Sequence, residues 1–325
     1  MLELRTGGDT KTDRPKCSDG IGSNLKRKDM NPLVTQVYNV VVPKFIRKKI
    51  LFKSLPGEII RYYEKHSDSM TAEIKEVLEY LREHRLAIFP YRYQHRYQEN
   101  DIEVFDDREK RLRYVIMDGK RLYFKRKWSA REIRRRYNWL LIEQDAASPH
   151  RYLTDRFSFE PGEILIDAGA ADGNFALSVV EKASRIVIFE PGREWIKPLQ
   201  ATFEPWKHKV QIIQKFVSDQ TGAGKTTLDS VLAPAKDRTM FLKIDVEGAE
   251  ASLLKGAERL LSAQTALKII ICTYHKQEDE EQFMNFFRKR DFDAVCSRGY
   301  MIFYHDKKMR APYLRRGLIR AKKSR

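Results

Sequence analysis

The second half of the chain alternates between short apolar runs and longer amphipathic stretches. The runs are rich in Ile, Leu and Val and lie at 164–167, 186–190, 210–213, 240–245 and 267–272. The amphipathic stretches lie at 174–183, 194–203, 250–261 and 278–290. Strands that alternate with helices in this way form a parallel sheet with helices on both faces. Two further runs, 292–296 and 300–304, are separated by only three residues, so they must be antiparallel. The pattern predicts an α/β fold with five parallel strands and a terminal antiparallel hairpin.

The first half has the pattern of an α+β extension. The spacing of apolar residues predicts a helix over 70–85. Asp118-Gly119, a dipeptide preferred in tight turns, separates two short apolar runs and predicts a hairpin. Ser129 precedes Glu132 by three residues, which is the capping box that opens another helix. The role of this region is not indicated by its sequence.

Composition divides the 325 residues into four segments. The first thirty residues contain few aliphatic side chains, and the last nineteen contain nine basic residues and no acidic one. Segments of this kind bury too little apolar surface to fold alone, and a charged terminus is usually solvated. We expect a disordered leader, a helical and hairpin region, the α/β domain and a basic C-terminal tail, at 1–30, 31–155, 156–306 and 307–325.

The basic balance of the chain, 62 Lys and Arg against 45 Asp and Glu, lies outside 161–306. A nucleic-acid channel would place that charge around the α/β domain, so nucleic acid is a disfavoured partner. Segment 34–55 mixes apolar and basic residues, which suits peripheral contact with an anionic membrane surface. A packing helix with solvated lysines explains the same segment.

The remaining composition points to the cytoplasm. No apolar run reaches the ~18 residues of a membrane span, and the chain begins with a polar segment that lacks a signal-peptide core. Cys17, Cys272 and Cys296 are scattered, which excludes a disulfide framework and gives no metal-binding spacing. We expect a cytoplasmic protein without a metal site, peripheral to the inner membrane face if segment 34–55 binds lipid.

A glycine loop follows the first strand of the α/β domain. Asp167 precedes Gly169 and Gly173, which let the backbone turn sharply and approach a ligand. The spacing is not that of a dinucleotide site, and an acid before the glycines suits a ligand with a positive amino group. A tight strand-to-helix turn without a ligand would need the same glycines.

An acidic residue also ends the second strand, and two polar residues follow the third. Glu190 lies where a carboxylate accepts hydrogen bonds from both hydroxyls of a nucleoside ribose, one strand–helix–strand step after Asp167. Ser218 and Asp219 follow the third strand and could bind an adenine amine, although polar residues of an exposed loop look the same.

The fourth and fifth strands bring acid–base groups to the same edge. Ligands of open α/β sheets bind beyond the carboxyl ends of the strands, so Asp245 should face the cleft. Glu247 and Glu250 follow it, but acids in the first turn of a helix also favour the helix dipole. His275 follows the fifth strand at the rim of the cleft.

These motifs together resemble the FkbM-type S-adenosylmethionine-dependent methyltransferases. The resemblance extends over about 161–304 and is carried by the glycine loop, by Phe189-Glu190-Pro191 and most specifically by the block 243–250. It implies a seven-stranded, Rossmann-like class I methyltransferase fold and methylation of a hydroxyl on a sugar, polysaccharide or related metabolite. The asparagine usual in the family's glycine loop is replaced here by Ala171 or Asp172.

The resemblance also implies roles for individual residues. The cofactor, S-adenosyl-L-methionine, would be bound by Asp167, Gly169, Ala170, Gly173, Asn174, Phe175, Glu190, Ser218 and Asp219. The acceptor side would be lined by Asp245, Glu247 and His275. His275 is the first candidate for the base that assists in-line methyl transfer, and Asp245 the second.

Other functions are compatible with parts of the sequence. A ribose-methylating RNA enzyme could use Lys243, Asp245 and Lys268. A non-catalytic protein could bind a polyanion on a degenerate fold of the same class. An NAD-linked oxidoreductase is disfavoured by the glycine spacing and by the closing hairpin.

Overall fold

The computed structural model describes residues 44–235, 238–306 and 309–323, with side chains from residue 52 onward. The chain divides into two compact units, Met1–Gly57 and Glu58–Arg325. The predicted leader and residues 34–43 lie outside the described residues. Helix α2, Lys44–Lys65, begins in the first unit and ends in the second. None of the helices in the described part of the chain is both long and apolar enough to cross a bilayer.

The region before the large sheet contains the predicted helix, hairpin and capping box. Its helices and strands are α3 (Ala72–Glu83), β1 (Phe105–Asp107), β2 (Leu112–Met117), β3 (Lys120–Tyr123) and α4 (Ala130–Glu143). Asp118 and Gly119 both have positive φ, as the turn between β2 and β3 requires. The side chains and backbones of Ser129 and Glu132 bond reciprocally at the start of α4. Short 3₁₀ turns lie at Ser67–Ser69, Arg92–Arg96, Glu99–Asp101 and Glu204–Trp206.

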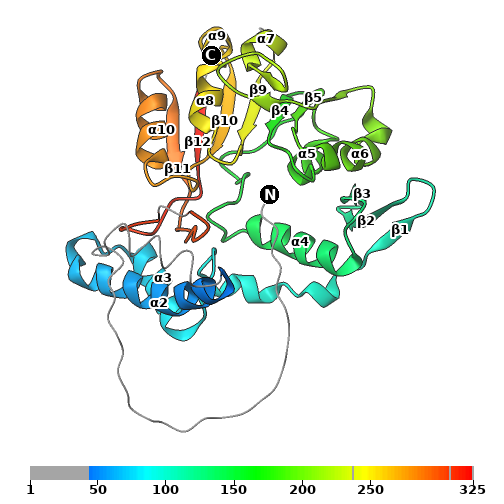
Figure 1. Cartoon of the computed structure of the whole chain (residues 1–325). Coiled ribbons are helices and arrows are strands. Elements are labelled where there is room, and N and C mark those ends of the chain that lie inside the picture. The colour runs from blue at the N-terminus through cyan, green and yellow to red at the C-terminus, as the bar shows by residue number, and fades with distance from the viewer. Residues whose placement is uncertain (1–43, 236–237, 307–308, 324–325) are drawn as a thin grey trace. The chain divides into compact units, whose positions relative to one another are not determined.

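A seven-stranded sheet forms the centre of the second unit (Figure 1), in the order β11-β12-β10-β9-β4-β5-β6. Its strands are β4 (Ile164–Ala168), β5 (Arg185–Phe189), β6 (Val210–Ile213), β9 (Met240–Ile244), β10 (Leu267–Cys272), β11 (Asp293–Cys296) and β12 (Leu318–Lys323). Strands β4, β5, β6, β9 and β10 are parallel, as predicted. A separate parallel pair, β7 (Phe216–Val217) and β8 (Lys225–Thr226), lies outside this sheet.

Helices cover both faces of the sheet. Alternate residues of each strand therefore enter two separate cores, one on each face. Leu165, Ile188 and Phe241 pack in one core with residues of α4, α5 and α6. Ile166, Leu242 and Ile271 pack in the other with residues of α7 to α10. The helices that follow α4 are α5 (Asn174–Val179), α6 (Arg193–Thr202), α7 (Leu228–Val231), α8 (Glu250–Lys255), α9 (Glu258–Ala263) and α10 (Asp279–Arg288). The expected fold class is therefore confirmed.

The antiparallel strands at the end of the sheet differ from the prediction, because one of the two paired strands is another segment of the chain. Strand β11 pairs not with 300–304 but with β12, which lies between β10 and β11 and runs antiparallel to both. Within 300–304, Met301 forms an isolated bridge with Arg315. The segment expected to be a solvated basic tail thus supplies an interior strand, which corrects its assignment.

The first four residues of β12 are buried, and its two lysines lie at the more exposed end of the strand. Leu318, Ile319 and Ala321 are fully buried. Arg320 is also buried, and its guanidinium donates to the carbonyls of Arg151 and Tyr152. The positive charge therefore occupies a site of backbone oxygens and does not prevent pairing in the sheet.

Candidate active site

A buried ion pair joins the ends of β4 and β9. Asp167 and Lys243 lie opposite each other in the register of the two strands, and Lys243 Nζ is 3.1 Å from Asp167 Oδ1. The same Nζ donates to the carbonyl of Gly169, at 2.7 Å. Burial raises the pKa of Asp167 and outweighs the opposing effect of Lys243. The ammonium thus ties the predicted glycine loop to the sheet.

Asp245 lies at the centre of a polar cluster just beyond β9. The hydroxyls of Tyr152 and Tyr274 each donate to its carboxylate at 3.2 Å. His150 Nε2 and His275 Nε2 lie 3.9 Å and 3.7 Å from it. Burial opposes ionisation of Asp245, but Lys243 and the two histidines lower its pKa to about 2. Asp245 is therefore an anion at neutral pH.

His275 links this anion to α8. Its Nδ1 lies 3.0 Å from Glu250 Oε1, and that oxygen also accepts the backbone N–H groups of Val246 and Gly248. Burial disfavours the imidazolium, but Glu250 and Asp245 outweigh it and raise the pKa of His275. Glu250 therefore orients both the loop after β9 and the histidine.

Glu247 differs from its neighbours because it is exposed. Its Oε2 is 3.8 Å from His275 Nε2, and its side chain is 63% exposed. Its φ of 55° lies in the left-handed region, which is costly for a residue with a side chain. The loop between β9 and α8 thus presents this carboxylate to solvent beside His275.

The glycine loop is shaped by close backbone packing. Gly169 has a φ of 80°, and a Cβ there would lie 1.9 Å from the carbonyl oxygen of Asp245. The loop after β4 therefore touches the loop after β9, and only glycine allows this approach. Asn174 begins α5, and its backbone N–H donates to Asp172.

Two residues assigned to the cofactor have side chains in the core. Ala170 and Phe175 are buried in the apolar cluster on the α5 side of the sheet. The ring of Phe175 packs against Tyr152 and Phe241, at centroid distances of 5.1 Å and 5.8 Å. The Phe175 side chain therefore belongs to the core, and the assignment of this residue to the cofactor stays a prediction that only its backbone could fulfil.

Glu190 lies at the end of β5 beside the glycine loop. Its two oxygens accept the backbone N–H groups of Ala171 (2.8 Å) and Gly192 (2.6 Å). Burial raises its pKa, against the opposing effect of these hydrogen bonds. The structure thus places Glu190 at the predicted strand end, bonded to the loop that follows β4.

Ser218 and Asp219 are bonded to another element. Ser252 of α8 donates to Asp219 Oδ1 (2.9 Å) and accepts from the Asp219 backbone (3.1 Å). These hydrogen bonds lower the pKa of Asp219. Both residues therefore connect the loop after β7 to α8, and their contact with an adenine stays a prediction.

The sequence did not indicate the residues that reach this site from the first half of the chain. Arg136 of α4 donates twice to Asp172 of the glycine loop, at 2.7 Å and 2.9 Å. Burial lowers the pKa of His150 to about 4, so this histidine is neutral at pH 7. The sequence shows a capping box that opens α4 and a histidine in the loop before β4. Neither feature indicates which residue of the α/β domain the side chain will contact.

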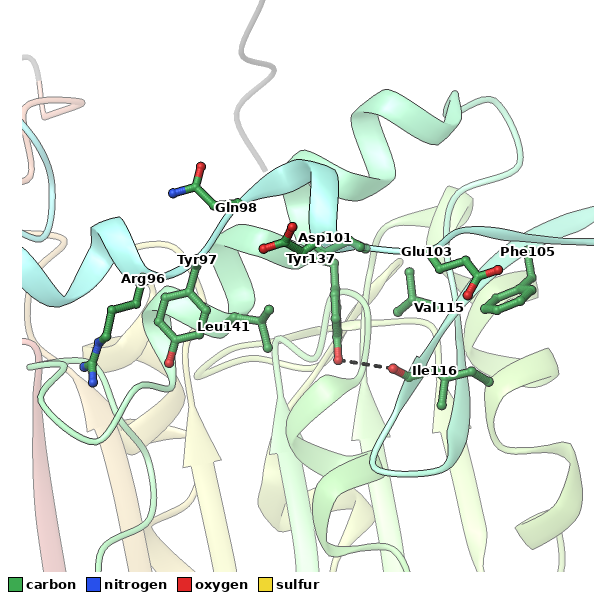
Figure 2. Close-up of a pocket in the computed structure, with 11 residues that line it drawn as sticks. Arg96, Tyr97, Gln98, Asp101, Glu103, Phe105, Val115, Ile116, Tyr137 and Leu141 are labelled. Atoms are coloured by element: carbon green, nitrogen blue, oxygen red, sulfur yellow. Dashed lines mark hydrogen bonds between the residues drawn. The ribbon is translucent and has the colours of Figure 1, made fainter.

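A pocket of about 350 Å³ lies on another side of α4. Figure 2 shows it between the segment 96–105, α4 and β2, with Tyr137 bonded to the carbonyl of Ile116. Tyr97 and Phe105 give it aromatic walls, and it contains none of the predicted site residues. The predicted chemistry therefore belongs to the sheet edge and not to this pocket.

Comparison with known proteins finds a family model that matches part of the chain. Residues 197–302 match the family described as "Methyltransferase FkbM domain". The predicted resemblance to FkbM-type methyltransferases is thus confirmed. The match includes Asp245, Glu247 and His275 and begins after the glycine loop. No curated protein matches the chain.

Solved structures similar to this chain include several methyltransferases. An rRNA methylase from Streptococcus thermophilus is 14% identical, with a TM-score of 0.35 over 51% of this chain and 89% of its own. The C-terminal domain of precorrin-6Y C5,15-methyltransferase from Rhodobacter capsulatus is 15% identical, with a TM-score of 0.35 over 51% and 82%. Trm5b from Pyrococcus abyssi is 12% identical, with a TM-score of 0.38 over 66% and 56%.

Proposed function

We propose that this chain is an S-adenosylmethionine-dependent O-methyltransferase whose acceptor is a hydroxyl of a glycan or a related small molecule. The observation that carries the proposal is the pairing of His275 with ionised Asp245 beside the glycine loop, 3.7 Å apart. An unactivated hydroxyl needs such a pair, because it reacts as a nucleophile only as its proton leaves.

The residues around the glycine loop fit the cofactor. Each oxygen of the Glu190 carboxylate accepts one backbone amide and has a second lone pair for a ribose hydroxyl. Asp167 is fully buried behind Lys243, so we assign it to holding that loop rather than to direct contact. The bound cofactor would supply an activated methyl group on a sulfonium.

The chain's own residues would then handle the proton. His275 Nε2 accepts it from the acceptor hydroxyl, and the Asp245 anion stabilises the resulting imidazolium. Asp245 is the weaker base of the two, because a carboxylate with a pKa of about 2 holds a proton poorly. Tyr152 and Tyr274 fix the position of that anion.

The position of Lys268 disfavours the RNA ribose alternative. Its Nζ donates to Ser158 O at 2.9 Å and pairs with Glu163 at 2.7 Å. It lies near the start of β10, whereas Asp245 follows the end of the neighbouring β9. The set Lys243, Asp245 and Lys268 is therefore not brought together.

The test is to incubate the purified chain with methyl-labelled cofactor and fractionated cell extract. We expect label in polysaccharide or lipid-linked glycan. Label confined to RNA would favour the ribose alternative, and no label together with no cofactor binding would favour the non-catalytic one.

Two variants test the assigned roles. His275→Ala should lower turnover by about 100-fold without changing cofactor affinity by calorimetry. Glu190→Gln should instead weaken cofactor binding about tenfold, because it removes a charged acceptor. His208→Ala, at an exposed histidine before β6, is the matched control and should behave as wild type. Unchanged turnover in His275→Ala would remove this residue from the mechanism.

A further inference from the structure

Three side chains at the edge of the sheet have the composition of a metal-ligand set. Asp245, Glu250 and His275 each offer one donor atom, and these atoms lie within 4.8 Å of one another. A divalent cation with bonds of about 2.0–2.2 Å joins donors that are roughly 3–4.3 Å apart. Closing the set around an ion therefore needs only a small movement of side chains.

Two of the three side chains are buried and have polar atoms without a hydrogen bond in the described part of the chain, whereas the partly buried Asp245 accepts from Tyr152 and Tyr274. His275 is 8% exposed, and its Nε2 points between Asp245 Oδ1 (3.7 Å) and Glu247 Oε2 (3.8 Å), beyond hydrogen-bond distance from both. Glu250 is 1% exposed, and its Oε2 has no hydrogen-bond partner among the described residues. A buried polar atom without a partner is costly, so these atoms mark a place for a bound group.

Carboxylates outnumber cations around these donors, although the buried Lys243 ammonium also acts on Asp245. Glu247 lies on the solvent side of His275, and Asp279 is close enough to Glu250 for the two carboxyls to repel. Lys276, which follows His275 in the chain, donates to the carbonyl of Gly248. A cation at the centre would neutralise several carboxylates at once.

We propose that Asp245, Glu250 and His275 bind a divalent cation of the Mn²⁺ or Mg²⁺ class. Carboxylate oxygens favour Mg²⁺ and Mn²⁺, and the single imidazole shifts the preference toward Mn²⁺. The exposed carboxylate of Glu247 lies on the open side, where water or an acceptor oxygen completes the coordination.

This site would change how the acceptor is activated, a consequence that rests on the proposed function. His275 is the base of the proposed function in the cation-free chain, and with the cation bound its imidazole would be a ligand instead. A hydroxyl oxygen bound to the cation would lose its proton more easily, and the exposed carboxylate of Glu247 would accept that proton. The cation itself can be detected without any methyl transfer.

A second set of donors provides an internal control. Asp245 also lies with His150 and Cys272 in a group of the same size. We do not expect that group to bind the cation, because Cys272 is fully buried and its Sγ already contacts His150 Nε2 at 3.6 Å. The two sets share Asp245, so variants of Glu250 and Cys272 separate them.

The test is titration of the full chain with Mn²⁺ at pH 7.5, with free Mn²⁺ followed by electron paramagnetic resonance. We expect one ion per chain with a Kd below about 1 mM. Glu250→Gln should weaken binding at least about tenfold, while its side-chain oxygen still accepts the Val246 and Gly248 amides. Cys272→Ser should bind as wild type does. Both variants should keep wild-type cofactor affinity, which separates this site from the methyltransferase assignment.

Three results would overturn the site: no Mn²⁺ binding by the wild-type chain at millimolar concentration, equal binding by Glu250→Gln, or loss of binding in Cys272→Ser alone. If Glu250→Gln fails to fold, His275→Gln removes the nitrogen ligand and should show the same loss. Mg²⁺ competition in the same assay identifies which of the two ions binds more tightly.

Discussion

Two ion pairs of this protein have similar geometry and opposite surroundings. Lys243 and Asp167 lie 3.1 Å apart in the sheet, with side chains 4% and 1% exposed. Arg113 and Asp106 lie 2.9 Å apart on the strands β1 and β2, with side chains 39% and 65% exposed. The shorter pair is screened by water and contributes little, whereas breaking the buried pair leaves a charge without compensation. Burial, and not distance, decides which pair matters.

The comparison also bears on function. A buried pair is expensive to desolvate, and apolar residues of similar volume often stabilise a fold equally well. Lys243 does more than pair, because it fixes the carbonyl of Gly169 and lowers the pKa of Asp245. The charges at the sheet edge are therefore best explained by the site that they shape.

The largest expected effect is that of Lys243→Met. It leaves Asp167 buried beside an apolar side chain and should lower the free energy of unfolding by about 3–5 kcal/mol, measured by urea denaturation. The double variant Asp167→Leu, Lys243→Met should be more stable than this single variant, because no charge is left unpaired. A single-variant cost below about 1 kcal/mol would mean that the pair is not buried in solution.

The second prediction concerns pH. His150 is buried, and burial lowers its pKa to about 4. As the pH falls, the unfolded chain therefore takes up a proton on this residue near pH 6.5, whereas the folded chain does so only near pH 4. This residue's contribution to stability is therefore present above pH 6.5 and is lost as the pH falls toward 4. Between pH 7.5 and pH 5 the loss is on the order of 2 kcal/mol.

The measurement is a difference between two chains, because other groups titrate in the same range. Burial raises the pKa of Glu143 to about 7, so this residue changes stability with the opposite sign between pH 4.5 and 7. The stability of wild type relative to His150→Gln should fall on acidification. Parallel pH profiles for wild type and His150→Gln would contradict the prediction.

The sequence predicts those parts of the fold that depend on local pattern. The five parallel strands are continuous runs of Ile, Leu and Val, and their ends locate Asp167, Glu190 and Asp245 at one edge. Strand β12 could not be found in this way, because Arg320 and Lys322 give it the composition of a solvated tail. Its pairing depends on backbone oxygens 168 and 169 residues away in sequence that accept the Arg320 charge.

In the site, too, local pattern predicts some features, and contacts between distant residues decide the others. Strand-end carboxylates and His275 follow from position along the chain, but their partners do not. Glu250 resembles a helix-start acid in the sequence, and only the fold brings it to 3.0 Å from His275. Phe175 follows a glycine loop that suggests a ligand contact, yet the direction of its side chain depends on how α5 packs.

The smallest expected effect is that of Asp106→Asn on the exposed pair. Arg113 keeps its bond to the carbonyl of Trp128, at 2.9 Å, and the asparagine keeps the size of the aspartate. The variant therefore removes only a solvent-screened attraction, which should cost less than about 0.5 kcal/mol in urea denaturation. The small difference should vanish when salt is raised, because the Debye length falls to about 3 Å at 1 M. A cost comparable with that of Lys243→Met, persisting in high salt, would show that exposure does not separate these two pairs.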